Sequence, residues 1–261
     1  MSLNETVLVE ARGLVKEYGA GRRVVDDVSF AIRRGETLGL VGESGSGKST
    51  VARMLLRLVE PTAGEVRYAE QDLLAMGSQE MRRMRRRMQI VFQDPFAALN
   101  PKMKIGQIVG EPFAIQGGFS REAVRTRVAE LMGEVGLETD VLERYPHEFS
   151  GGQRQRINIA RALALKPEFL ALDEPVSALD VSVGAQVINL LKELQRTHGL
   201  TYLFISHSMP LVRYLCDRVV VMQRGRVVES GTWREVCDAP REAYTRQLLA
   251  ATPELPVVTR V

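Results

Sequence analysis

Short apolar runs separated by polar or glycine-containing turns recur along the chain and predict a series of β-strands. Strand-like runs cover residues 7–9, 25–32, 36–41, 65–68, 88–92, 169–172 and 201–206, and two more, 219–222 and 227–229, flank a hairpin signal at 223–226. The run at 169–172 is apolar throughout, which is typical of a strand at the centre of a parallel sheet.

Segments with helical character alternate with these strands. They cover residues 49–58, 81–88, 183–196, 233–237 and 242–250, together with most of the stretch 100–163. Glycines at 117–118 and within 133–136 interrupt the long stretch, which we expect to be a helical insertion between strands. The alternation of strands and helices predicts an α/β fold with a largely parallel sheet.

The helix predicted over 81–88 carries three methionines at helical spacing and five arginines. The methionines would form one apolar face. The arginines raise two possibilities, a nucleic-acid contact or a solvated helix face. Because no aromatic residues are interleaved with them, we prefer the solvated face.

Composition narrows the function only slightly. The 261 residues include 35 basic and 32 acidic side chains, and this balance indicates no particular charged partner. No run approaches the roughly 20 apolar residues of a membrane-spanning helix, and no signal peptide is visible. Cys216 and Cys237 lack a CxxC spacing, so we expect them to be ordinary thiols in a reducing compartment. We therefore expect a protein kept in the cytosol, with any membrane attachment supplied by another subunit.

The strand predicted at 36–41 runs into a loop with the pattern GxxxxGK[ST], and a predicted helix follows. The glycines allow backbone N–H groups to surround phosphate oxygens, and the helix N-terminus adds positive potential. Lys48 would bridge the β- and γ-phosphates of a nucleotide, and the Ser49 hydroxyl would bind Mg²⁺. The alternative, a glycine-rich turn before an ordinary helix, does not explain the Lys-Ser pair in this context. The expected phosphate-binding residues are Gly42, Ser44, Gly45, Ser46, Gly47, Lys48, Ser49 and Thr50.

Two adjacent acids follow the apolar strand at 169–172. Asp173 would hold Mg²⁺, and Glu174 is placed to polarise an attacking water molecule. A solvated loop is the alternative for such a pair. Together with the phosphate loop, the second acid indicates hydrolysis rather than nucleotide binding alone.

Further motifs surround these two sites. Residues 150–153 (SGGQ) resemble the signature of ATP-binding-cassette (ABC) ATPases and lie between the phosphate loop and the acidic pair, in the order of that family. Gln93 resembles the family's Q-loop, residues 177–180 its D-loop and His207 its switch histidine. Tyr18 precedes the phosphate loop, where the family has an aromatic residue that stacks on adenine. With these motifs in the right order, the chain is identified as similar to ABC ATPases.

The resemblance implies a P-loop NTPase ABC-ATPase fold. This fold has a mostly parallel core sheet, an N-terminal antiparallel β subdomain and an inserted helical subdomain. Within one ABC ATPase domain, residues 1–93 and 165–250 would form the RecA-like core with the β subdomain. Residues 94–164 would form the helical subdomain, and residues 251–261 a loose C-terminal tail.

The resemblance also implies roles for individual residues, with ATP and Mg²⁺ as cofactors. Glu174, Gln93 and His207 would be catalytic. Ser49, Gln93 and Asp173 would hold Mg²⁺, and Tyr18 would stack on adenine, although a packing role for Tyr18 stays open. Two subunits would bind two ATP molecules head to tail, and ATP binding would close this dimer until hydrolysis opens it. The residues that complete the partner's ATP site would be Ser150, Gly151, Gly152, Gln153 and Asp180.

One position departs from the family pattern. Ser208 follows the switch histidine, where Asp is common. A serine is also a good helix N-cap. We therefore expect Ser208 to cap the following helix and activity to be retained.

Longer stretches, 91–101, 145–149, 173–183 and 243–253, are similar to the ATPases of oligopeptide, dipeptide and nickel importers. Phe96 favours the second, F-type ATPase of such importers. The resemblance implies an ATPase that powers import of peptides or, as the alternative, of nickel or another small solute. With only two cysteines in the chain, we expect no iron–sulfur cluster.

The same resemblance implies the partners. They would be a sister ABC ATPase, in a heterodimer or a homodimer, and two transmembrane permease subunits that contact residues 96–101. An extracytoplasmic substrate-binding protein would act indirectly, and no nucleic acid is expected. The chain would lie peripherally on the cytoplasmic face of the inner membrane.

Other functions explain the motifs less well. An ABC ATPase of chromosome organisation or DNA repair would need a long coiled coil between the nucleotide motifs, and residues 48–150 contain no sustained heptads. A translation factor of this type usually has two cassettes in one chain, and this chain has one. A small-molecule kinase would not explain residues 150–153.

Overall fold

The computed structural model describes residues 6–19 and 21–251. The chain forms two compact units, one from residues 1–77 with 201–261 and the other from residues 78–200. The predicted division of the domain at 93/94 and 164/165 stays a prediction. The predicted tail, 251–261, lies outside the described residues except for Ala251.

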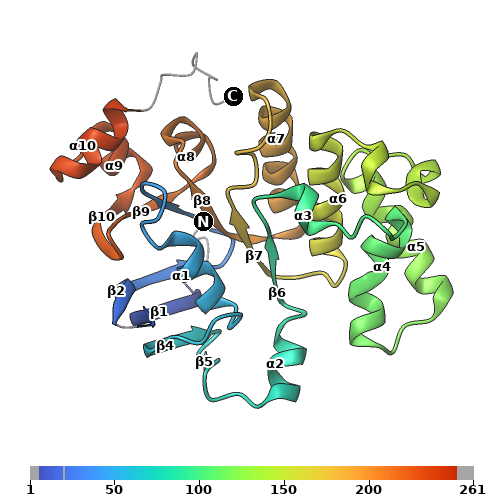
Figure 1. Ribbon diagram of the computed structural model, residues 1–261, viewed down its shortest axis with the longest axis horizontal. Helices are drawn as coiled ribbons and strands as arrows, with labels where there is room; N and C mark the ends of the chain where they lie inside the picture. Colours follow the sequence, from blue (N-terminus) through green and yellow to red (C-terminus); the bar gives the residue numbers. More distant parts are fainter. Residues whose placement is uncertain (1–5, 20, 252–261) are drawn as a thin grey trace. The chain divides into compact units, whose positions relative to one another are not determined.

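The first unit contains two groups of strands and several helices (Figure 1). Its elements are β1 (Val7–Tyr18), β2 (Arg22–Arg33), β3 (Thr37–Val41), α1 (Lys48–Leu55), β4 (Ala63–Tyr68), β5 (Gln71–Asp72), β8 (Thr201–Ser206), α8 (Met209–Leu215), β9 (Arg218–Gln223), β10 (Arg226–Thr232), α9 (Trp233–Asp238) and α10 (Ala243–Ala250).

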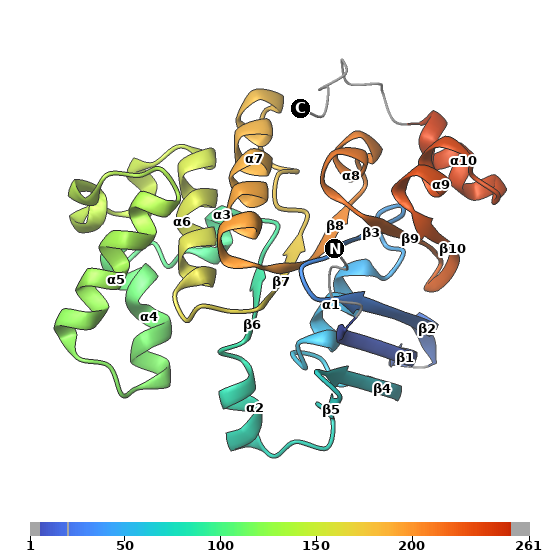
Figure 2. The same ribbon diagram turned by 180° about the vertical axis from the view of Figure 1, so that it is seen from behind.

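The N-terminal strands form the predicted antiparallel sheet, with the order β2-β1-β4-β5; β1, β2 and β4 lie side by side in Figures 1 and 2. β1 and β2 have 12 residues each and extend well beyond the apolar runs at 7–9 and 25–32. Beyond the run at 7–9, β1 mixes buried apolar residues, Ala11 and Leu14, with half-buried or exposed polar ones, and register shifts interrupt its pairing with β2. Apolar periodicity therefore located these strands but not their ends.

β3 lies between β8 and β9 and pairs with both in parallel, and β10 pairs with β9 in the predicted hairpin. Every residue of β3 and β8 is buried, which is typical of strands inside a parallel sheet. Val41, at the end of β3, is level with Ser206 of β8 and Val221 of β9. Gly42 and His207, the next residues along their strands, therefore leave the sheet at the same edge.

The second unit contains two parallel strands, and most of its other residues lie in helices (Figure 2). Its elements are α2 (Ser78–Met84), β6 (Met88–Val91), α3 (Pro95–Ala98), α4 (Ile105–Gln116), α5 (Arg121–Glu134), the 3₁₀ helices η1 (Thr139–Glu143) and η2 (Pro146–Glu148), α6 (Gly151–Leu163), β7 (Phe169–Asp173) and α7 (Val181–His198). The predicted breaks at 117–118 and 133–136 fall at the C-terminal ends of α4 and α5.

The helix predicted over 81–88 is wrong at its C-terminal end. α2 stops at Met84, and Met88 is the first residue of β6. Tight turns close the helix, because the N–H groups of Arg86 and Arg87 donate to carbonyl groups three residues back. The Arg87 carbonyl then accepts from the N–H group of Phe169, beside the start of the β6–β7 pairing. The methionines are nevertheless buried and the arginines exposed or half-buried, so the predicted solvated face is confirmed.

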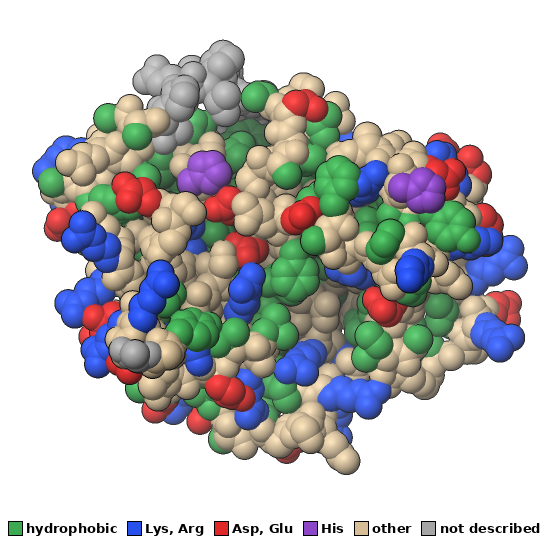
Figure 3. Space-filling model, in the orientation of Figure 1, with side chains coloured by type: hydrophobic (Ala, Val, Ile, Leu, Met, Phe, Trp, Pro, Cys, Tyr) green, Lys and Arg blue, Asp and Glu red, His purple; other side chains and the backbone are tan. Residues whose placement is uncertain are grey.

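Charged groups do not gather by sign on the molecular face in Figure 3, where basic and acidic side chains are interspersed. No helix within residues 6–19 and 21–251 has the length and apolar character needed to cross a bilayer. Cys216 and Cys237 are both buried, and neither is part of a disulfide. The mixed charges on the face shown in Figure 3 do not indicate a partner that is strongly acidic or strongly basic.

Candidate site for nucleotide binding and hydrolysis

The predicted phosphate loop connects β3 to α1. At two of its glycines, neighbouring backbone atoms lie too close to leave room for a side chain. Gly42 has a φ of +150°, and a Cβ atom there would lie 2.1 Å from the carbonyl oxygen of Met222. Gly47 has a φ of +103°, and its Cβ atom would lie 2.6 Å from the carbonyl oxygen of Val24. L-residues are also strained at such φ values. The loop is thus folded tightly against the backbones of β9 and β2.

Lys48 lies at the start of α1, with only 4% of its surface exposed. Its ammonium group donates to the carbonyl oxygens of Gly42 (2.8 Å) and Glu43 (2.7 Å) and lies 3.3 Å from Ser46 Oγ. A buried ammonium group needs such acceptors, because an unpaired buried charge is strongly unfavourable. These bonds hold the positive charge on the loop itself.

The N-terminus of α1 has the chemistry of an anion site. Its N-cap is Gly47, which has no side chain to accept hydrogen bonds from the first-turn N–H groups. Ser49 and Thr50 in that turn are half-buried, whereas Ser44 and Gly45 at the tip of the loop are exposed. A helix N-terminus next to a lysine and hydroxyl groups fits the phosphates of a nucleotide.

Elements distant in the sequence hold the loop in place, and no sequence motif revealed them. The N–H group of Gly225, in the β9–β10 turn, donates to the Ser46 carbonyl oxygen (3.1 Å), while the Gly225 carbonyl accepts from the Asp26 N–H group (2.9 Å). On α10, the Tyr244 hydroxyl accepts from the N–H group of Glu43 (3.0 Å). The loop is therefore bonded directly to the β9–β10 turn and to the C-terminal helix, and through Gly225 to β2.

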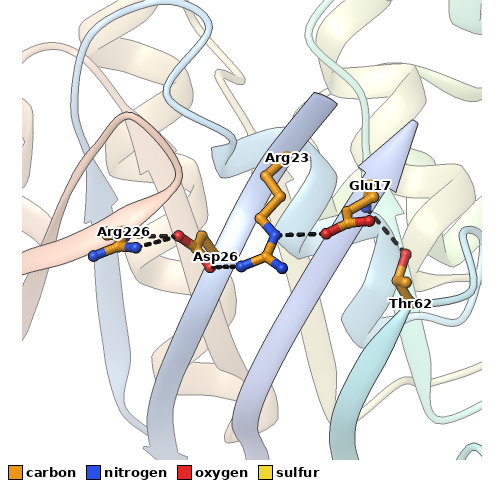
Figure 4. Close-up of polar contacts among 5 residues, drawn as sticks. All are labelled: Glu17, Arg23, Asp26, Thr62 and Arg226. Carbon is orange, nitrogen blue, oxygen red and sulfur yellow. Dashed lines mark hydrogen bonds and ion pairs between the residues drawn. The ribbon is translucent and has the colours of Figure 1, made fainter. Parts of the chain in front are cut away.

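Tyr18 is the last residue of β1, and 45% of its surface is exposed. Ion pairs beside it connect β1, β2 and β10: Arg23 contacts Glu17 and Asp26, and Asp26 contacts Arg226 (Figure 4). Hydrogen bonds from Arg226 and then Arg23 hold the pKa of Asp26 below its ordinary value. An exposed aromatic ring on a braced strand end offers a platform on which a planar group can stack.

His207 directly follows β8 and is exposed. Ser208 is the N-cap of α8, but its side chain makes no capping hydrogen bond, so the prediction that it caps this helix is wrong. One reason is that Pro210, at the second helical position, has no N–H group to donate. The N–H group of Ser208 donates instead to Ser206 Oγ (3.0 Å).

In the second unit, β6 and β7 align three of the candidate residues. Val91 is level with Leu172 in this parallel pair. Gln93 and Glu174 each come two residues later in the chain, just beyond their strands, and Gln93 Nε2 donates to Glu174 Oε2 at 3.1 Å. Asp173, the last residue of β7, is buried. The fold thus brings the glutamine to the acidic pair across a sequence separation of 81 residues.

The backbone of Glu174 has a φ of +47°, which is uncommon for a residue other than glycine. Its carbonyl oxygen accepts from both the N–H group (3.2 Å) and the hydroxyl group (3.1 Å) of Ser177. Asp180 closes this segment as the N-cap of α7, where bonds from the Val183 N–H group and the Ser182 hydroxyl lower its pKa. Sparsely populated backbone conformations like that of Glu174 cluster at functional sites.

The predicted signature, residues 150–153, forms the start of α6. Ser150 is the N-cap: its Oγ accepts from the Gln153 N–H group (3.4 Å), and its own N–H group donates to Gln153 Oε1 (3.1 Å). Gly151 and Gly152 follow, and a Cβ atom on Gly152 would lie 2.2 Å from the Val183 side chain. Because a hydroxyl group that accepts one hydrogen bond can still donate its own proton, Ser150 suits an anion at this helix N-terminus.

The candidate residues fall into two groups. The phosphate loop, Tyr18 and His207 belong to the first unit. Gln93, Asp173, Glu174, Asp180 and the signature belong to the second.

Comparisons with known proteins show the family of the chain. The model of the ABC transporter family matches residues 25–177, a span that includes the phosphate loop, the signature and the acidic pair. The dipeptide transport ATP-binding protein DppF of Escherichia coli is 51% identical over 233 residues, which cover 89% of this chain and 70% of DppF. The oligopeptide transport ATP-binding protein AppF of Bacillus subtilis is 49% identical over 242 residues, covering 92% and 74% of the two chains.

A solved structure extends the likeness to three dimensions. The dimeric ATP-binding cassette MJ0796, in a post-hydrolysis state bound to ADP and Pi, has a TM-score of 0.78 at 31% identity. The match covers 87% of this chain and 99% of that one. Sequence and fold therefore agree: this chain belongs to the ABC transporter family and is one of its ATP-binding, ATP-hydrolysing subunits.

Proposed function

We propose that this chain is one of two ATPase subunits that together power an importer of peptides. The contact between Gln93 and Glu174 at the end of β7 is the observation that carries the hydrolytic part of the proposal. The peptide class is supported by DppF and AppF, which are named for dipeptide and oligopeptide transport. The test is whether a peptide-loaded binding protein stimulates ATP hydrolysis by the assembled transporter while nickel does not, as peptide cargo predicts. Stimulation by nickel and not by peptide would exclude peptides as the cargo.

The phosphate loop binds the β- and γ-phosphates of ATP in this proposal, through Lys48 and the N-terminus of α1. Tyr18 stacks on adenine. Ser49, Asp173 and the amide oxygen of Gln93 hold Mg²⁺, and oxygen ligands of this kind are the ones that Mg²⁺ prefers. When bound, Mg²⁺ neutralises charge that develops on the phosphates.

Glu174 acts as the general base for the attacking water. A carboxylate accepts up to about four hydrogen bonds, so the bond from Gln93 fixes its orientation without exhausting its capacity to accept one from water. The hydrogen bonds from Ser177 fix the backbone at the same point. His207, which leaves the sheet at the same edge as the phosphate loop, is the third proposed catalytic group.

Ser150, Gly151, Gly152, Gln153 and Asp180 contact the ATP held by the sister subunit, and the dimeric state of MJ0796 supports such a pairing. Two permease subunits contact residues 96–101 from the membrane, which places the chain on its cytoplasmic face. Phe96 is exposed, and the Arg154 guanidinium lies 4.0 Å from its ring centre. This contact joins the proposed permease-binding segment to the signature helix.

Glu174→Gln tests the hydrolytic part. We expect ATP binding to persist, the hydrolysis rate to fall by about 10²–10⁴-fold, and an ATP-bound dimer to accumulate in size-exclusion chromatography. Glu138→Gln, an exposed glutamate in the same unit, serves as the control and should behave like the wild type. Wild-type turnover by Glu174→Gln would exclude Glu174 as the base.

A further inference from the structure

The C-terminal helix α10 reaches the phosphate loop through the side chain of Tyr244. This residue is only 7% exposed, and its hydroxyl accepts a 3.0 Å hydrogen bond from the N–H group of Glu43. Glu43 directly follows Gly42 in the loop. The pattern GxxxxGK[ST] contains no tyrosine, and the two residues lie 201 positions apart.

Tyr244 and Lys48 hold opposite ends of one peptide group. The Glu43 N–H group and the Gly42 carbonyl belong to the same planar peptide bond. Tyr244 accepts from the N–H group, while Lys48 Nζ donates to the carbonyl oxygen at 2.8 Å. The tyrosine therefore fixes the direction of the carbonyl to which Lys48 binds, and hydrogen bonds at the two ends polarise one another.

The start of α10 is anchored so that Tyr244 keeps this position. The Glu229 carboxylate on β10 accepts from the N–H groups of Arg241 (2.8 Å) and Glu242 (3.2 Å), immediately before the helix. Within the helix, Thr245 and Leu248 are buried. A shift of the start of α10 away from the loop would break the hydrogen bonds to Glu229.

We infer that Tyr244 is a positioning residue for ATP: by orienting the peptide group between Gly42 and Glu43, it sets the position of Lys48 and hence the affinity for nucleotide. The inference rests on the proposed role of Lys48 in binding phosphates. It makes α10 a part of the nucleotide site, although the helix need not touch ATP. Any displacement of this helix lowers ATP affinity.

Tyr244→Phe, which removes only the hydroxyl, tests the inference in the full chain. We expect the Kd and KM for ATP to rise about three- to tenfold, as for one lost hydrogen bond. The unfolding midpoint should stay within about 4 °C of the wild type, and kcat should change less than KM. Tyr145→Phe, the same chemical change on an exposed ring in the other unit, should leave KM unchanged.

A double-mutant cycle shows whether Lys48 transmits the effect. In a Lys48→Ala background, Tyr244→Phe should change the residual nucleotide affinity by less than about twofold, and a full effect there would overturn the inference. Wild-type KM in Tyr244→Phe would overturn it too, while leaving the proposed function intact. Normal ATP binding by Lys48→Ala would instead overturn the proposed function.

Glu229→Gln provides a second test should Tyr244→Phe fail to fold. It weakens the anchor of α10, and so displaces Tyr244, without changing the tyrosine side chain itself. A raised KM for ATP supports the inference, and an unchanged KM overturns it.

Discussion

Two helix N-termini in this chain suit anions, and they are built in different ways. α1 begins after Gly47, which has a positive φ and no capping side chain, and its loop is held by β2, the β9–β10 turn and α10. α6 begins after Ser150 and is closed by the capping box of Ser150 and Gln153. The first is held by hydrogen bonds from distant parts of the chain, whereas the cap of the second is formed within four consecutive residues.

The difference follows from what each helix is proposed to bind. A glycine cap offers the first-turn N–H groups to a ligand, but it cannot stabilise the helix end, so neighbouring backbone must hold the loop. A capping box stabilises the helix end locally, which suits a signature that meets its ATP only when a partner arrives. Substitutions around the loop should therefore affect ATP binding within one subunit, and those at Ser150 should affect the dimer.

Gly47→Ala should produce the largest effect. The new Cβ atom would lie 2.6 Å from the Val24 carbonyl oxygen at a φ of +103°. We expect at least about a 100-fold loss of ATP affinity, since left-handed strain of about 1–2 kcal/mol adds to a backbone clash. Isothermal titration calorimetry with ATP measures the loss.

Gly45→Ala is the matched control for that substitution. Gly45 has a φ of +81°, but nothing lies within 4 Å of its Cβ position. Strain alone should lower the affinity about tenfold or less. Equal losses in the two variants would show that the contact with β2 does not shape the loop, and the contrast with α6 would then fail.

The same contrast explains what could be predicted from the sequence. The phosphate loop, the signature and the acidic pair are runs of consecutive residues whose chemistry can be read directly, and the fold class follows from apolar periodicity. Gly225 and Tyr244 support the loop through a backbone contact and a single hydroxyl, and no local pattern marks either. Local patterns fail at two positions: the pairing of β6 with β7 places Met88 in a strand despite its helical spacing, and Pro210 removes one N–H group that Ser208 could have capped.

Ser150→Ala should have a smaller and different effect. Loss of the cap should lower stability by about 1 kcal/mol, or about 2–4 °C in the unfolding midpoint, with ATP affinity of the single subunit unchanged. Dimer formation with ATP in the Glu174→Gln background should weaken, which analytical ultracentrifugation measures.

Ser120→Ala separates capping from function. Ser120 caps α5 in the same unit, with its Oγ accepting from the Ala123 N–H group at 3.1 Å, and it has no proposed role in the site. It should lower the unfolding midpoint by a similar amount and leave the dimer unaffected. An equal weakening of the dimer by both variants would reduce Ser150 to a structural cap.

Arg226→Gln should have the smallest effect, because it removes an exposed ion pair but no backbone contact to the loop (Figure 4). Gly225, next to it, should keep its bonds to Ser46 and to the Asp26 N–H group. We expect the unfolding midpoint to change by about 2 °C or less and the KM for ATP by less than about twofold, as for other surface ion pairs. Any difference should shrink further in about 0.5 M salt, where exposed charges are screened. A rise in KM as large as that expected for Tyr244→Phe would mean that side-chain charge, rather than backbone hydrogen bonding, holds the phosphate loop against β2.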